Sequence, residues 1–414
     1  MLAKPKGTYD VYGEYGKKVK FIENYLGSFL ETYNYEYVRT PIFESSELFH
    51  RNIGDTTDIV TKETYDFKDR GDRDLTLRPE GTAGVARMIL ENKLSLSTPL
   101  PLKYWYYGPN YRYERPQNGR FREFYQFGIE VYGSNDPAID VEVIGLGYQL
   151  FTGLGLENVT VHLNTLGNKE SREMYRKALV EYFKDKVSDL CEDCQERYQK
   201  NPLRILDCKV DADSDILKNA PKTIDYLDEE SRVFFEKVKN YLEDLDINYV
   251  VDPKIVRGLD YYTHTIFEYQ DSSSLALGGG GRYDNLLEDI GGTSSPAVGM
   301  AIGIERFISA LEENEINIDL KDNLDCFIMY VNDEEKEQAL TLLQELRLNG
   351  FKADTEYTGR SLKAQFKQGD RFNTKLFIII NSEDLSMVTV KDNVTKEEIK
   401  VKLTELVSYL DMNI

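Results

Sequence analysis

The chain of 414 residues is 41% hydrophobic and 30% charged, which indicates a soluble globular protein long enough for two or three domains. Its net charge of −21 excludes nucleic-acid binding through the overall field of the molecule, so such contacts need a local basic patch. No apolar run approaches a membrane span of about 18 residues, and the N-terminus lacks the apolar core of a signal peptide. We therefore expect a cytoplasmic protein that does not bind membranes.

Helices and strands alternate irregularly over the first three quarters of the chain. Apolar periodicity predicts them in the order helix 17–34, strand 36–43, strand 72–80, helix 81–90, hairpin 111–132, helix 136–153 and strand 159–163. The region of about 168–250 is helical and highly charged and interrupts strand-rich sequence, so we interpret it as an insertion. Strands and loops return at 255–306.

A second boundary lies near residues 318–324, after which the pattern changes. Strands 326–331, 376–380 and 388–390 alternate with helices 334–349 and 404–410, and the apolar strand 376–380 suits a buried parallel position. We expect an α/β protein in two domains. The first, 1–320, is of α+β type and includes the insertion; the second, 324–414, is α/β.

The hairpin at 111–132 is the most informative segment, because four arginines surround its turn. On its second strand Phe121, Tyr125, Phe127, Ile129 and Val131 form an apolar face. The opposite face carries Arg122, Phe124, Gln126, Gly128 and Glu130, and Arg112 and Glu114 share a face of the first strand. One arginine guanidinium can bind two oxygens of a carboxylate or phosphate at once, and it keeps its charge when partly buried. Taken alone, the pattern also fits a solvated, salt-bridged outer face.

Two further segments carry candidate site residues. In LRPEGT, Glu80 and Thr82 stand where a strand ends and a helix begins, beside free backbone N–H groups; a helix cap is the alternative interpretation. In VRGLDYYTHTIFE, Arg257 suits a substrate carboxylate, and Tyr261 and Tyr262 offer hydroxyl groups within an apolar wall. We interpret His264 of this segment as structural rather than catalytic.

A third segment, GMAIGIER, ends in Arg306 at the start of a predicted helix. Its glycines permit close backbone approach, and the arginine suits ATP phosphates; a tightly packed strand–helix junction is the alternative. The chain shows no Ser-His-Asp arrangement, P-loop or dinucleotide GxGxxG. Arginines without a covalent nucleophile favour displacement at a phosphoryl group, where catalysis is positioning plus charge neutralisation.

Six segments together resemble the histidyl-tRNA synthetases, a family of class II aminoacyl-tRNA synthetases. YRYE with its continuation RPQNGRFREFYQFGIEVYG resembles motif 2, AIGIERF resembles motif 3, and YNYEYVRTPIFE resembles motif 1, a dimer-interface element. LRPEGT and RGLDYY resemble the two histidine-specific segments, and GRSLKAQFKQGDR resembles part of the anticodon-binding domain. The resemblance implies an antiparallel-sheet catalytic core, a homodimer, and ligation of histidine to its tRNA through histidyl-adenylate.

The resemblance also implies an ATP site formed by five of these residues. Arg112 would hold the α-phosphate and the carboxylate region of the amino acid. Glu114 would meet the adenine amino group, and Phe124 would stack on the adenine ring. Arg120 and Arg306 would bind the γ-phosphate. Mg²⁺ would accompany ATP, held mainly by the phosphates rather than by a protein ligand set.

For histidine, the resemblance implies that Arg257 neutralises charge at the carboxylate and α-phosphate during attack, so that Arg257 and Arg112 are the catalytic pair. A pocket that pairs both imidazole nitrogens rejects apolar analogues without an editing domain. The residues implied to contact histidine are Glu80, Thr82 and Gln126 for the α-amino group, Glu130 and Tyr262 for the imidazole, and Arg112, Arg257, Tyr261 and Tyr283 around them.

A basic stripe supplies the nucleic-acid patch that the net charge conceals. Arg360, Lys363, Lys367, Arg371 and Lys375 recur at spacings of 3, 4, 4 and 4, which makes one stripe if the helix continues through Lys375. Leu362 and Phe366 would face the core. A solvated charged face is the usual interpretation of such a stripe, but the motif set favours tRNA contact. By resemblance, Arg115 and Gln117 would lie near the acceptor end of tRNA.

The cysteines suggest a second possible site. Cys191, Cys194 and Cys208 offer three thiolates for zinc, but a fourth ligand is not evident nearby, so we expect reduced thiols rather than structural zinc. The stretch 269–277 is shorter and richer in serine than the family pattern.

Two rival functions remain. The first is a catalytically inactive paralogue, the regulatory subunit of ATP phosphoribosyltransferase, which would lack the second domain and much of the arginine set. The second is an ATP-dependent ligase of the same fold that does not act on RNA, against which the basic stripe argues.

Overall fold

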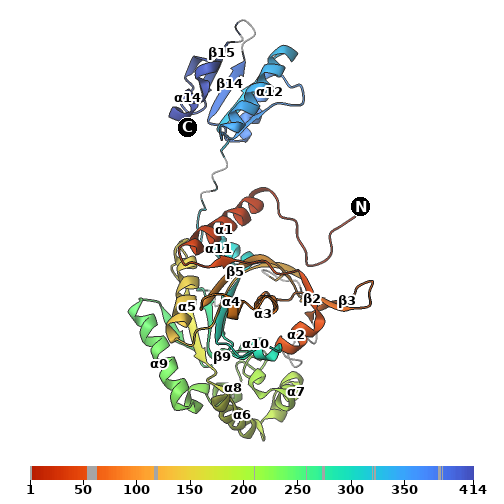
Figure 1. The fold of residues 1–414 in the computed structure, drawn as a ribbon, viewed down its shortest axis with the longest axis vertical. Coiled ribbons are helices and arrows are strands. Elements are labelled where there is room, and N and C mark those ends of the chain that lie inside the picture. Colours follow the sequence, from red (N-terminus) through yellow and green to blue (C-terminus); the bar gives the residue numbers. More distant parts are fainter. Residues whose placement is uncertain are drawn as a thin grey trace. The chain divides into compact units, whose positions relative to one another are not determined.

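The computed structural model describes residues 2–53, 63–115, 120–208, 210–257, 259–272, 276–318, 320, 323–380, 384 and 386–414. The chain forms two compact units, Met1–Ile318 and Asp319–Ile414 (Figure 1). None of the helices in the described ranges has both the length and the apolar content that crossing a bilayer requires.

An eight-stranded sheet forms the centre of the first unit, in the order β1–β5–β6–β11–β10–β9–β7–β8. Only the outermost pairs, β1 with β5 and β7 with β8, are parallel, and the pairs between them are antiparallel. The predicted antiparallel-sheet core is therefore confirmed. Its strands are β1 (Glu36–Tyr37), β5 (Leu102–Tyr111), β6 (Glu123–Tyr132), β7 (Thr160–Thr165), β8 (Tyr249–Val251), β9 (Thr263–Gln270), β10 (Ala276–Arg282) and β11 (Ala297–Gly303).

Alternate residues of β6 lie on opposite faces of this sheet. Phe127, Ile129 and Val131 belong to the larger core, while Tyr132 belongs to a second core. The predicted two-faced strand is confirmed, but the alternative of a solvated face is wrong, because Glu130 is only 1% exposed. Helices of the larger core are α1 (Gly13–Glu31), α5 (Pro137–Thr152), α9 (Glu229–Asp244) and α11 (Ile304–Glu313), and those of the second are α3 (Thr82–Glu91) and α10 (Leu286–Asp289).

The predicted strand 36–43 is two short strands in different sheets. β1 ends at Tyr37, and β2 (Phe43–Ser45) joins β4 (Asp74–Leu77) and β3 (Tyr65–Lys68) in a three-stranded sheet. Pro41 stands between them and has no N–H to donate to a ladder, which explains the break. Helix α2 (Ser46–Ile53) follows, and the short α4 (Leu94–Ser97) precedes β5.

The region between β7 and β8 is helical, but its helices belong to two cores. Helix α9 packs into the larger core through Phe235, Val238 and Leu242, and it lies against α5 (Figure 1). The preceding helices form a small core of their own that includes Tyr175 and Leu179. They are α6 (Lys169–Phe183), α7 (Glu192–Lys200) and α8 (Asp215–Lys218), with 3-10 turns η2 (Val187–Asp189), η3 (Pro202–Ile205) and η4 (Thr223–Tyr226).

The second unit is a five-stranded sheet in the order β13–β12–β14–β15–β16. Strand β14 (Leu376–Ile380) lies at its centre, parallel to β12 as expected from its apolar sequence and antiparallel to β15. The other elements are β12 (Cys326–Met329), β13 (Ala353–Thr355), β15 (Met387–Asp392), β16 (Glu398–Lys402), α12 (Asp333–Leu348), α13 (Leu362–Arg371) and α14 (Leu403–Asn413).

The helix of the basic stripe is shorter than its spacing suggested. Helix α13 ends at Arg371, where Asn373 adopts a left-handed φ of 49° and Phe372 N–H bonds to the Gly369 carbonyl. Lys375 lies beyond the helix and pairs with Asp325 at 3.2 Å. The helix therefore does not continue through Lys375, and the prediction that this residue shares the stripe is wrong.

Candidate active site

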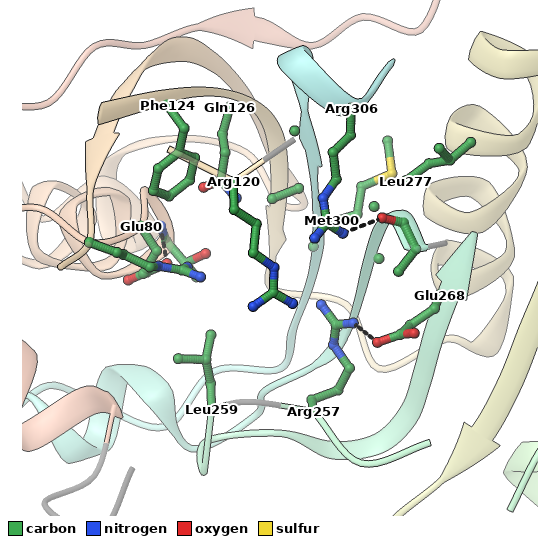
Figure 2. A pocket seen from close by; sticks show the side chains of 18 of the residues that line it. Glu80, Arg120, Phe124, Gln126, Arg257, Leu259, Glu268, Leu277, Met300 and Arg306 are labelled. Atoms are coloured by element: carbon green, nitrogen blue, oxygen red, sulfur yellow. Dashed lines mark hydrogen bonds and ion pairs between the residues drawn. The ribbon is translucent and has the colours of Figure 1, made fainter. Parts of the chain in front are cut away.

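A cavity of about 380 Å³ lies against β5, β6, β9, β10 and β11 (Figure 2). The predicted residues that line it come from loops and strands far apart in the sequence. They are Glu80, Thr82, Arg112, Glu114, Arg120, Phe124, Gln126, Arg257, Tyr261, Tyr262, Tyr283 and Arg306.

Three arginine side chains converge on one side of the cavity. Figure 2 shows the guanidinium groups of Arg120, Arg257 and Arg306 turned toward one another, although they come from different elements. Burial, and then the positive charge of Arg120, lower the pKa of Arg306 from its ordinary value. Like charges held this close create a site that favours an anion.

Arg257 and Arg306 are each held by a close contact with the protein. Arg257 donates to Glu268 Oε1 at 2.5 Å and lies 5.8 Å from the centre of the Tyr262 ring, while its Nε is buried and unpaired. Arg306 donates to the Ala276 carbonyl at 2.6 Å. These contacts fix both side chains before any ligand binds, which reduces the ordering cost of binding.

Arg112 lies in the loop after β5 rather than on the strand that the sequence suggested, since β5 ends at Tyr111. Its Nε donates to the Pro79 carbonyl at 2.9 Å, and its guanidinium lies 5.3 Å from the centre of the Phe124 ring. Glu114 follows in the same loop and pairs with Arg120 at 3.3 Å. An aromatic ring, a carboxylate and two cations thus lie side by side.

Glu80 and Thr82 lie at the start of α3. The Glu80 carboxylate accepts hydrogen bonds from the backbone N–H groups of Thr82 at 2.7 Å and Ala83 at 2.8 Å. The helix-cap interpretation is therefore right, and the same carboxylate also lines the cavity. Burial raises the pKa of Glu80, while the N–H groups of Ala83 and Thr82 oppose that shift.

Glu130 lies directly behind the cavity wall rather than in it. Thr82 Oγ1 donates to its Oε1 at 2.8 Å, Tyr106 OH donates to the same oxygen at 3.1 Å, and Tyr283 OH bonds to Oε2. All three hydroxyl groups belong to residues that line the cavity. Burial raises the pKa of Glu130 to about 8, so this carboxyl holds its proton at neutral pH.

Close strand packing around Glu130 depends on glycine. Gly299 of β11 is the register partner of Glu130, and a Cβ added there would collide with Glu130, Tyr283 and the Ile129 carbonyl. Gly128 of β6 leaves the same kind of space for the Tyr106 ring. Glycine at these two positions lets β6 and β11 lie close to the buried polar network, and a larger residue there would displace it.

Several cavity residues were missed by the sequence analysis. Glu268, the partner of Arg257, stands opposite Gly279 in the ladder of β9 and β10, a relationship that only the fold reveals. Glu305, within AIGIERF, accepts from the Tyr125 N–H at 2.7 Å and bonds to Tyr9 OH. Its position before Arg306 was a signal that could have been used.

The described residues that were predicted to contact tRNA are not among those that line the cavity. Arg115 is exposed at the start of the motif 2 loop, and Gln117 lies outside the described residues. Arg360, Lys363, Lys367 and Arg371 are exposed on or beside α13 of the second unit, whose Leu362 and Phe366 face its core as expected. His264 is not a cavity residue and lies against Phe234.

A separate cluster lies in the helical region. Cys191, Cys194 and Cys208 are joined by Asp211, and the donor atoms of all four lie within 4.8 Å of one another. The expectation that no fourth ligand stands nearby is therefore wrong. The four thiol and carboxylate groups have the composition of a metal site.

Comparison with known proteins identifies relatives along the whole chain. Residues 7–307 match the family model described as histidyl-tRNA synthetase, and residues 325–413 match that of the anticodon binding domain. A Geobacillus sp. (strain WCH70) protein named histidine–tRNA ligase is 46% identical over 413 residues, with 98% of each chain covered.

Solved structures give a similar result. The crystal structure of apo S. aureus histidyl-tRNA synthetase has a TM-score of 0.85 at 40% identity, covering 99% of this chain and 100% of that one. A Bacillus halodurans C structure described as an ATP phosphoribosyltransferase regulatory subunit/histidyl-tRNA synthetase has a TM-score of 0.63 at 21% identity, covering 92% and 98%. That second likeness concerns the fold alone.

Proposed function

The chain belongs to the histidyl-tRNA synthetase family, and we propose that its cavity forms histidyl-adenylate from histidine and ATP before histidine passes to tRNA. Its activity is the ligation of histidine to tRNA. The observation that carries the proposal is the convergence of Arg112, Arg120, Arg257 and Arg306 on one cavity that also contains Glu80 and Thr82.

The first step brings two anions together. An oxygen of the histidine carboxylate attacks the α-phosphorus of ATP, the bond from that phosphorus to the bridging oxygen breaks, and pyrophosphate leaves. Arg112 and Arg257 would neutralise the charge that the carboxylate and α-phosphate share in the transition state. No protein base is needed, since the carboxylate is already ionised at neutral pH.

ATP would lie along the wall formed by β6 and the motif 2 loop. The adenine would stack on Phe124, its amino group would meet Glu114, and the γ-phosphate would meet Arg120 and Arg306. Glu114 and Arg120 now pair with each other. We infer that the nucleotide replaces this pair with one contact to adenine and one to phosphate.

Mg²⁺ fits this site as a companion of ATP rather than as a resident ion. Of the carboxylates that line the cavity, Glu114 pairs with Arg120 and Glu268 pairs with Arg257, so each is already compensated. Because both carboxylates are paired with arginines, they suit an ion that keeps several water ligands and is bound mainly by the phosphates of ATP. When bound, Mg²⁺ supplies additional neutralisation of the phosphate charge.

Histidine would bind between α3 and the tyrosines of the second core. Glu80 and Gln126 would accept hydrogen bonds from the α-amino group beside Thr82. The imidazole would meet Tyr261, Tyr262 and the network of Glu130, with Tyr283 between the ring and that carboxyl. A buried polar network of this kind leaves unpaired groups when a non-polar analogue binds, so it favours histidine strongly.

The remaining assignments concern assembly and tRNA. We propose domains at 1–320 and 324–414, the second binding the anticodon region through Arg360, Lys363, Lys367 and Arg371. Arg115 and Gln117 would meet the acceptor end. Motif 1, at 33–44, would form the interface of a homodimer, and the protein would act in the cytoplasm.

Charging of histidine tRNA tests the proposed function. The full-length protein with ATP, Mg²⁺ and labelled histidine should attach histidine to this tRNA and to no other. The regulatory-subunit alternative is less supported, because the second unit and the arginine set are both present. Absence of charging by folded protein would favour that alternative.

A further inference from the structure

The strongest unassigned feature is the cluster in the helical region, away from the residues that line the active-site cavity. We propose that Cys191, Cys194, Cys208 and Asp211 bind one structural Zn²⁺ ion. Three cysteine sulfurs and one carboxylate oxygen make four ligands, the number that structural zinc sites use. The ion would join the start of α7 to the chain that follows η3.

The distances match tetrahedral zinc. With bonds of about 2.3 Å to sulfur and about 2.0 Å to oxygen, tetrahedral geometry separates two sulfurs by about 3.8 Å and a sulfur from an oxygen by about 3.5 Å. The Sγ atoms of Cys191 and Cys208 are 3.6 Å apart, and Cys208 Sγ is 3.4 Å from Asp211 Oδ2. These two distances suit one ion, and all the donor atoms lie within 4.8 Å of one another.

The local backbone supports thiolates at this position. Cys191 is the N-cap of α7, and Cys194 lies in its first turn, where the helix dipole favours negative charge. The Asp211 N–H donates to Cys208 Sγ at 3.4 Å, and the Cys191 N–H donates to Asp211 Oδ2 at 3.0 Å. These N–H groups orient the ligands, as outer hydrogen bonds do in metal sites.

A disulfide is the main alternative, because it also uses closely spaced cysteines. All four cysteines of the chain are free. A Cys191–Cys208 bond would leave Cys194 as an odd buried thiol and would give the Asp211 carboxylate no role. Zinc uses all four groups, including a carboxylate that a redox pair does not need.

The zinc region also contacts the proposed histidine pocket. Asn201, at the end of α7, donates to Asp260 Oδ1 at 3.3 Å, and Arg204 of η3 pairs with the same oxygen at 3.2 Å. Asp260 directly precedes Tyr261 and Tyr262, which line the cavity. If the proposed function holds, loss of zinc should loosen this loop and raise the KM for histidine more than it lowers kcat.

Elemental analysis of the full-length protein tests the site independently of activity. Protein purified under reducing conditions without chelators should contain about one zinc per chain, and metal-depleted protein should take up one equivalent of Zn²⁺ alone. Cys194→Ser should lose the metal, whereas Asp211→Cys should retain it by offering a fourth thiolate. Cys326→Ser is the matched control, since Cys326 is buried in the other unit.

Three results would overturn the proposal. The first is wild-type protein that neither contains zinc nor binds it, and the second is Cys194→Ser protein with the same zinc content as Cys326→Ser. The third is an intact disulfide between Cys191 and Cys208 after anaerobic purification. If Cys194→Ser does not fold, binding of Co²⁺ to metal-depleted wild-type protein is the test instead. The protein should bind one equivalent of Co²⁺ and show thiolate-to-cobalt absorption. A lack of that absorption would overturn the proposal.

Discussion

Thr82 Oγ1 donates a 2.8 Å hydrogen bond to Glu130 Oε1, which joins the first turn of α3 to the C-terminal part of β6. This bond connects the wall of the proposed histidine pocket to the buried carboxyl of Glu130, whose pKa is raised to about 8 by burial. The raised pKa means that ionising Glu130 destabilises the fold as pH rises from its ordinary pKa through about 8.

Histidine affinity should therefore have a bell-shaped pH dependence. A buried site favours zero net charge. Glu130 and the imidazole of bound histidine should therefore hold one titratable proton between them, so that either both groups are neutral or they form an ion pair. Free imidazole gains a second proton below about pH 6.5, and Glu130 loses its own above about 8. Calorimetric titration should show affinity falling about tenfold per pH unit beyond each limit.

The Glu130→Gln variant separates this effect from other titrations. The variant keeps any dependence that comes from the α-amino group of histidine but cannot lose a proton near pH 8. Its alkaline limb should move to higher pH, with weaker binding overall. An unchanged limb near 8 would show that Glu130 does not control it.

Gly299→Ala should disturb the same network from the neighbouring strand. The added methyl group would stand 2.5 Å from the Ile129 carbonyl, a backbone atom that cannot move away cheaply, and would crowd Glu130 and Tyr283. Overpacking of this kind costs about 1–3 kcal/mol. Steady-state kinetics should show a KM for histidine raised about tenfold or more, with the KM for ATP changed much less.

Gly27→Ala in α1 is the matched control, since its new Cβ would make ordinary contact with Trp105 at 3.8 Å. Both KM values should remain unchanged in that variant. Equal increases of the two KM values in Gly299→Ala would instead indicate general misfolding.

The Arg282–Asp140 pair should matter for stability rather than for catalysis. Both side chains are fully buried, and Arg282 also donates to the Ser134 carbonyl at 3.0 Å. Arg282→Leu would leave Asp140 buried without its cation, which costs about 3–5 kcal/mol. The midpoint of urea unfolding should fall accordingly. Arg232→Leu, which breaks an exposed pair with Glu229, should change the free energy of unfolding by less than about 1 kcal/mol.

Charge reversal on α13 should separate tRNA binding from adenylate formation. Lys363→Glu with Lys367→Glu places two negative charges on the exposed face of this helix, so tRNA affinity should fall and become less dependent on salt. Pyrophosphate exchange should stay unchanged. Lys396→Glu with Lys400→Glu is the control, with the same charge change at exposed positions outside α13. Equal loss of tRNA binding in both double variants would contradict the assignment.

Period-two and helical patterns were sufficient to predict β6, α3 and α5, because those signals lie within one element. Glu80 was recognisable from the strand–helix junction that it caps. Local sequence could not reveal that Glu130 has a raised pKa, because its burial depends on β5, β11 and α3 closing around it. The same reason hid Glu268, whose relationship to Arg257 depends on how the loop before β9 folds back.

Asp211 and Lys375 illustrate the opposite errors. Asp211 follows Cys208 at the same spacing that separates Cys191 from Cys194, but a carboxylate in place of a thiol hides it from a pattern of cysteines; the fold shows that it completes the set of four donors. Lys375 fitted the spacing but lies beyond the turn at Asn373 that ends α13. Spacing predicts a shared face only while the helix lasts.

Histidine-dependent exchange of pyrophosphate into ATP tests the central claim most directly, because it needs adenylate formation and no tRNA. The wild-type protein should catalyse exchange with histidine and with no other amino acid. Arg257→Ala should keep its fold yet reduce exchange by several orders of magnitude, since it removes a cation from two reacting anions. Absence of exchange in the folded wild-type protein, or a loss below tenfold in Arg257→Ala, would contradict this account.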